Sequence, residues 1–155
     1  MSLQDYASRK YDFLGFQNVV GGGDRKLGLA LYSTDTAGKL CVGIQKLAQR
    51  WALEFLTEVG SMPGRPARGC EFMASVRTGK LQTQKQVIWS FLSSNLDIER
   101  NLRNEEYAGM PDDERYSTAT LTAVTFYPGY LEMHVMIESL AGDARAVILP
   151  VDTLP

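Results

Sequence analysis

The stretch 40–72, LCVGIQKLAQRWALEFLTEVGSMPGRPARGCEF, decides the fold that this sequence predicts. Apolar residues recur at helical spacing through its first half and form one stripe: Ile44, Leu47, Ala48, Trp51, Phe55 and Val59. We expect a helix over about 42–59 that ends at a left-handed Gly60. Pro63 and Pro66 then keep the helix from restarting. Because an apolar stripe needs a partner surface, the stretch predicts a helix packed on other elements, followed by a stiff Gly/Pro loop.

The composition indicates one globular domain of ordinary charge. The chain has 155 residues, a formal net charge of -2 and two cysteines. Mixed charges give no basic field for nucleic acid, so none is expected as a partner. Neither a signal-like apolar run nor about 18 consecutive apolar residues occur, so we expect synthesis in the cytoplasm and no membrane contact. In that reducing compartment Cys41 and Cys70 are expected to be free, buried thiols rather than a disulfide.

The segment 1–39 is expected to be extended, and either loosely structured or ordered by a partner. Its aromatic residues, among them Tyr11, Phe13 and Phe16, either dock on neighbouring molecules or fold back onto the chain's own core. Three glycines at 21–23 lack the Gly-Lys-Ser/Thr ending of a phosphate-binding loop. Leucines alternate with other residues at 27–31, which predicts a short strand. We therefore divide the chain into this segment and a single α+β domain over 40–155.

A second helix is predicted to start near Thr83. Its expected inner face carries Val87, Ile88, Phe91, Ile98 and Leu102. Ser93, Ser94 and Asn95 favour caps over helix interiors, so the segment is either one kinked helix or two short helices. The residues from 101 to 117 lose periodicity and predict an exposed loop. The acidic run 112–114 within it lacks the ligand spacing of a calcium loop and is interpreted as a solvated charge run.

The last third predicts an antiparallel β unit. Residues 119–127 are rich in β-formers, and Pro128 and Gly129 stand where a type II turn needs them. In the next strand Leu131, Met133, Val135 and Ile137 share a core face, whereas Glu132, His134, Met136 and Glu138 share a mostly wet face. A third strand is expected over 145–151. The predicted fold is α+β, with two main helices packed on a small antiparallel or mixed sheet.

Catalytic, cofactor and metal sites are not predicted. His134 is the sole histidine, and neither a nucleophile nor an orienting partner is placed beside it by the sequence. Glu132 and Glu138 flank it on one face, which alternation on an exposed sheet explains equally well. A glycosidase needs only two carboxylates, which the chain offers in Glu54, Glu58, Glu71 and Glu99.

The order of elements resembles a known family. A short apolar strand is followed by the helix and loop GIQKLAQRWALEFLTEVGSMPGRPARG, a second helix ending near IERNL, and a hairpin with a third strand. Over 27–151 this resembles the baseplate wedge and sheath-initiator family of contractile phage tails, sometimes called lysozyme-like, with relatives in type VI secretion baseplates. The best local signals are the helix ending in Phe55-Leu56-Thr57 and the Gly-x-Pro-type loop after it, with Gly60, Pro63, Pro66 and Gly69.

The resemblance implies partner-binding residues. The family's second helix often ends in a Glu-Pro-Arg signature that clasps the core bundle of the wedge, and the nearest equivalent here, 98–102, lacks the proline. Glu99 and Arg100 are therefore expected at an interface, the alternative being an exposed ion pair on a helix. The loop that carries Pro63, Arg65 and Pro66 is expected to touch a neighbour.

The implied function is structural and non-enzymatic, with no cofactor. Several copies would sit beside the tail tube in a six-fold virion assembly, join other wedge proteins, and offer the terminal sheet as a template for the first ring of sheath protein. An open sheet edge is a ready site for another chain's strand. Two alternatives remain open: a small carboxylate-dependent peptidoglycan hydrolase, and an adaptor for tail assembly that is absent from the finished virion.

Overall fold

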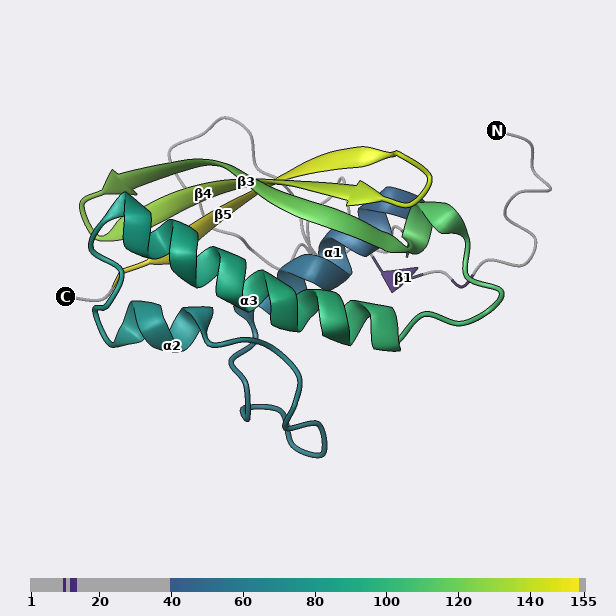
Figure 1. Cartoon of the computed structure of the whole chain (residues 1–155), viewed down its shortest axis with the longest axis horizontal. Helices are drawn as coiled ribbons and strands as arrows, with labels where there is room; N and C mark the ends of the chain where they lie inside the picture. The colour runs from purple at the N-terminus through teal and green to yellow at the C-terminus, as the bar shows by residue number, and fades with distance from the viewer. Residues whose placement is uncertain (1–9, 11, 14–39, 154–155) are drawn as a thin grey trace.

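A three-stranded antiparallel sheet lies over a layer of helices in this chain (Figure 1). The structure is a computed structural model that describes residues 10, 12–13 and 40–153. Within them it confirms the α+β class, with three α-helices and two small sheets. In chain order the elements are β1 (Asp12–Phe13), β2 (Leu40–Cys41), α1 (Gly43–Leu56), α2 (Phe72–Arg77), α3 (Gln84–Asn104), the 3-10 turn η2 (Asp112–Glu114), β3 (Tyr116–Tyr127), β4 (Tyr130–Ser139) and β5 (Ala144–Asp152).

The sheet has β4 at its centre, between β3 and β5. Gly129 takes a φ of 85° in the predicted turn, and the rings of Tyr127 and Tyr130 stack across it with centroids 4.7 Å apart. The core face of β4 is buried as predicted: Leu131, Met133, Val135 and Ile137. The opposite face is exposed to solvent only in part, because Glu132 is 8% exposed. Its Oε1 lies 2.9 Å from His134 Nε2.

Helix α1 supplies the centre of the core. Trp51 and Phe55 are fully buried with their rings stacked, and both contact Phe91 of α3. The helix ends at Leu56, so the prediction of a stop at Gly60 is wrong. Thr57 leaves the helix in an extended conformation, and its carbonyl accepts a hydrogen bond from Cys70 N at 2.9 Å. This tertiary bond ends the helix one turn early and leaves the predicted core residue Val59 42% exposed.

Helix α3 is one continuous helix of 21 residues. Thr83 and Gln86 form a reciprocal capping box at its start, which satisfies two backbone donors. The expected interruption at Ser93–Asn95 does not occur, because Ser94 and Asn95 are held by tertiary packing and contacts while Ser93 faces solvent. Ser94 is buried, and Asn95 accepts from Trp51 Nε1 and donates to the Tyr116 hydroxyl, both at 3.0 Å.

The smaller elements β1, β2, α2 and η2 were not predicted. The short helix α2 buries Phe72 and Val76 beside α1 and α3. Strand β1 pairs antiparallel with β2, so part of the N-terminal segment belongs to the described fold. The side chain of Phe13 is 68% exposed, so within the described residues it does not fold back into the core. The predictions for Tyr11, Phe16, the glycines 21–23 and the strand at 27–31 lie outside the described residues.

Both cysteines are free and buried, as predicted. Burial is the main cause that raises the pKa of the Cys41 and Cys70 thiols. Cys70 Sγ lies 3.3 Å from the Phe55 carbonyl oxygen. These two thiols are therefore neutral core groups.

Candidate partner-binding surface

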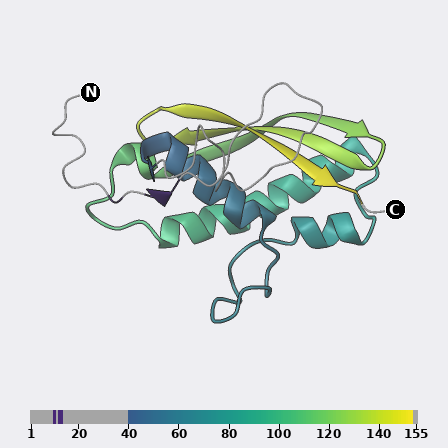
Figure 2. The same cartoon turned by 180° about the vertical axis from the view of Figure 1, so that it is seen from behind.

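The loop between α1 and α2 projects from the helix layer on the side away from the sheet (Figures 1 and 2). We call residues 57–71 the projecting loop. Pro63, Arg65 and Pro66 lie in its exposed part, as the sequence predicted for the loop. Successive turns shape this part, with Arg65 N donating to the Met62 carbonyl and Gly60 N to the Pro66 carbonyl. The tip therefore presents prolines and a cation to solvent in a hydrogen-bonded conformation.

A buried charge network anchors the base of the projecting loop. Glu54 of α1 is 4% exposed and forms an ion pair with Arg68 of the loop. Its Oε2 also accepts from Gly69 N at 3.0 Å and from Asn101 Nδ2 of α3 at 3.3 Å. Arg68 also pairs with Glu105 just after α3. A buried carboxylate is stable only when such partners compensate its lost hydration, so the loop, α1 and α3 are tied together at this point.

Glu105 extends this network to a second arginine. It pairs with Arg50 of α1 at 2.8 Å. Burial lowers the pKa of the Arg50 guanidinium, whereas nearby carboxylates, Glu114 first, oppose that shift. Arg50 and Arg68 thus hold one carboxylate between helix and loop.

Gly69 closes the neck of the loop. Its φ is +87°, and a Cβ added there would lie 2.2 Å from the carbonyl oxygen of Thr57. Cys70 N donates to that same oxygen, and Val59 N donates to the Cys70 carbonyl at 3.2 Å. Only glycine allows two backbone segments to approach so closely. The neck is consequently a short parallel bridge, between Glu58 and Cys70, rather than an open loop base.

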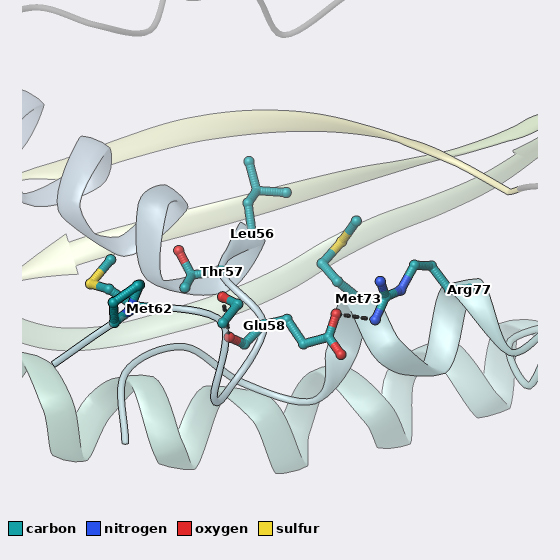
Figure 3. A pocket seen from close by; sticks show the side chains of 8 residues that line it. Leu56, Thr57, Glu58, Met62, Met73 and Arg77 are labelled. Carbon is teal, nitrogen blue, oxygen red and sulfur yellow. Dashed lines mark hydrogen bonds and ion pairs between the residues drawn. The ribbon is translucent and has the colours of Figure 1, made fainter. Parts of the chain in front are cut away.

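A groove of about 520 Å³ runs beside the neck (Figure 3). Its apolar lining comes from both sides: Leu56, Met62, Pro63 and Met73. Figure 3 shows Glu58 between Met62 on one side and Met73 with Arg77 on the other, and Glu58 pairs with Arg77. Methionine side chains adapt to apolar groups of varied shape, so this groove adds an adaptable apolar surface beside the projecting loop.

A second exposed surface lies on α3 and was missed by the sequence analysis. Four large apolar side chains on this helix are exposed: Ile88, Trp89, Leu92 and Leu96, with Trp89 at 72%. Their spacing places them within one stripe, turned away from the buried residues Phe91, Ile98 and Leu102. We call these four residues the α3 stripe. The sequence contains this spacing, but the predicted inner face includes Ile88 together with Val87, so the periodicity does not reveal a second stripe.

Glu99 and Arg100 make exposed ion pairs within α3. Arg103 Nε lies 2.8 Å from Glu99 Oε1, and Arg100 Nη2 lies 2.8 Å from Asp97 Oδ1. Glu99 and Arg100 therefore take part in exposed ion pairs on a helix, which was the alternative to an interface role. This surface remains accessible. Glu99 lies two residues from Asn101, about 200° around the helix, so it continues the α3 stripe rather than facing the neck.

Three of the four carboxylates considered for a hydrolase form ion pairs with different arginines in different parts of the structure. Glu54 is buried in the neck network, Glu58 pairs with Arg77, and Glu99 pairs with Arg103 on the outer side of α3. Glu71 is exposed. Among residues 10, 12–13 and 40–153 no group of three His, Cys, Asp or Glu is placed to hold a metal ion. The same part of the chain contains no helix that is long and apolar enough to cross a membrane.

Comparison with protein-family models, with curated proteins and with solved structures finds no match for this chain.

Proposed function

We propose that this chain is a structural subunit of a contractile phage tail baseplate, which joins wedge proteins around the tail tube and initiates sheath assembly. In this proposal it is made in the host cytoplasm and becomes part of the virion, in several copies of a six-fold assembly. Its partners are other wedge proteins, the tube proteins and the sheath protein. The resemblance in element order suggests this assembly, and the projecting loop is the observation that carries a partner-binding role.

The loop supports that role because its base is rigid while its tip is exposed. The neck uses a glycine that no other residue can replace without strain, and a buried network around Glu54 that is stable only when its charges are paired. Their effect is to hold Pro63, Arg65 and Pro66 at a fixed distance from the body. Prolines and a fixed backbone lose little entropy on binding, so such a loop binds a partner at low conformational cost.

The sheet supports the proposed sheath contact through β3. The two edge strands are β3 and β5. Just after β5 the Thr153 N–H donates to the Gly129 carbonyl at 2.9 Å, and backbone groups alternate in direction along an antiparallel strand. Pro150 therefore stands at a position that faces the outer edge, where it removes a donor. We assign the sheath contact to β3, whose outward residues include exposed threonines.

The test is co-purification of the chain with wedge and sheath proteins from particles assembled in the host. Arg65→Glu at the loop tip should reduce recovered partners at least about tenfold, corresponding to about 1.4 kcal/mol. Lys80→Glu, a charge reversal at another exposed residue, in the turn before α3, is the matched control and should leave recovery unchanged. Arg100→Glu should keep the circular dichroism spectrum and reduce wedge association, as the resemblance implies.

Three outcomes overturn the proposal. A stable chain that binds neither wedge nor sheath proteins has no place in a baseplate. A chain that supports assembly but is absent from finished virions by electron microscopy is an adaptor. Clearing of a peptidoglycan suspension that depends on Glu54 or Glu99 identifies a hydrolase.

A further inference from the structure

The α3 stripe is large enough to need a partner when the subunit is free. A tryptophan carries about 150–250 Å² of surface, and Trp89 shows most of it to solvent beside two exposed leucines. Contiguous apolar surface of this kind on a soluble chain marks an interaction site. The stripe is separate from the projecting loop, so it is not explained by the loop's proposed contact.

Apart from Trp89, the apolar groups of the stripe and the charges at its two ends are symmetric about Leu92. The mirror position of Trp89 is Asn95, whose amide bonds Trp51 and Tyr116 instead. Lys85 lies seven residues before Leu92 and Glu99 seven residues after it, which is about 10.5 Å along the axis in each direction. Seven residues are close to two turns, so both charges lie on the same side as Leu92. Ile88 and Leu96 stand four residues before and after it. A second copy of the helix that runs in the opposite direction therefore presents Ile88, Leu92 and Leu96 at matching heights, and its charges at the two ends are opposite to those of the first copy.

We propose that two copies of the free subunit pair through α3, antiparallel, with Leu92 on the two-fold axis. In this arrangement Lys85 of each copy faces Glu99 of its partner, and Ile88 with Trp89 packs on the partner's Leu96. A two-fold interface uses the same patch on both copies, which is what a self-complementary stripe provides. The Glu99 carboxylate already bonds Arg103 at 2.8 Å, and its remaining oxygen can accept from a lysine.

Charge complementarity favours the antiparallel pair of helices over a parallel pair. A parallel dimer would place Lys85 beside Lys85 and Glu99 beside Glu99, and like charges at close range destabilise an interface. The antiparallel pair instead makes two opposite-charge contacts. One helix pair buries less than the about 1,200 Å² of a standard interface, so the dimer is expected to be weak, dissociated near 1 µM and formed near about 100 µM. This inference shares Glu99 with the wedge contact that the resemblance implies, but it concerns the isolated chain, and self-association of the purified chain tests it separately from the proposed baseplate role.

Sedimentation equilibrium of the full chain between about 1 and 100 µM tests the dimer. Leu92→Ser should shift the midpoint of dimer formation at least tenfold upward. Leu53→Ser, a matched change at an exposed leucine of α1, should leave it unchanged. Circular dichroism of each variant checks that both remain folded.

Charge exchange tests the antiparallel register. Lys85→Glu alone and Glu99→Lys alone each create two like-charge contacts per dimer and should abolish pairing. A mixture of these two variants restores opposite charges at both contacts, so it should form a heterodimer, and the double variant K85E/E99K should form a homodimer. A wild-type chain that stays monomeric at 100 µM overturns the proposal. A dimer that survives Leu92→Ser, or single charge variants that do not recover on mixing, overturns it equally.

Discussion

Gly69→Ala probes the neck of the projecting loop more directly than any other single change. The left-handed φ of this residue costs an alanine about 1–2 kcal/mol. The new Cβ would also lie 2.2 Å from the Thr57 carbonyl oxygen, a backbone atom, so the two segments must separate. Separation stretches the bond from Cys70 N to Thr57 O and the bond from Gly69 N to the Glu54 carboxylate, worth about 1 and 2 kcal/mol. We expect a total loss of about 4–5 kcal/mol in the free energy of unfolding.

Gly64→Ala is the matched control. Gly64 has a φ of +78°, and no atom lies within 4 Å of its would-be Cβ. Alanine there should cost only the backbone term, about 1–2 kcal/mol. Urea unfolding at pH 7, followed by the fluorescence of the tryptophans, gives both values. The difference of about 3 kcal/mol measures the closed neck. Equal losses at the two glycines would show that the neck yields without cost, and the argument for a rigid loop would then be wrong.

Two further predictions concern buried polar groups. Lys46→Met removes the ion-pair partner of Glu114, which lies 2.7 Å from Lys46 Nζ and is fully buried, so we expect a loss of about 3–5 kcal/mol in urea unfolding. The double variant K46M/E114L should recover only part of it, because Gly43 N–H then loses its acceptor, Glu114 Oε1 at 3.3 Å; a loss that is equal or larger in the double variant contradicts the assignment. Burial is also the largest cause that raises the pKa values of Cys41, Cys70 and Tyr116, so the neutral forms are favoured in the folded state. Since the unfolded thiol and phenol ionise near about 8.5 and 10, stability should be complete below about pH 8 and fall as the pH rises above it; unfolding free energies that are level from pH 7 to 10 refute this.

Elements with a local cause were predictable from the sequence. The α1 stripe with Trp51 and Phe55 has helical period, and the β4 residues alternate with period two, so each pattern identifies its own buried face. The turn around Gly129 needs a positive φ, and glycine supplies it. The exposure of Arg65 in the loop was likewise predictable, because prolines on both sides exclude helix and sheet pairing.

Features that depend on distant partners were not predictable. Helix α1 ends at Leu56 because Cys70, 14 positions beyond it, bonds the Thr57 carbonyl, and no local signal marks that bond. Helix α3 continues through Asn95 because Trp51 and Tyr116 occupy its amide. The α3 stripe was missed for a different reason. Val87 and Ile88 are adjacent and both apolar, and periodicity over a short span assigned both to one face.

The stretch that decides the fold therefore couples stability to presentation of the loop. Glu54 precedes the core residue Phe55 on α1 and anchors Arg68, so one helix builds the core on one side and fixes the neck on another. A substitution at Glu54 or Gly69 must change both the free energy of unfolding and the position of the loop. If such a variant loses partner binding, the loss cannot be assigned to one of these two effects alone. Substitutions at the tip separate the two effects, because Pro63 and Arg65 contribute nothing to the neck network. Binding that depends on Arg65 while unfolding does not is the result that assigns the loop to a partner rather than to the fold.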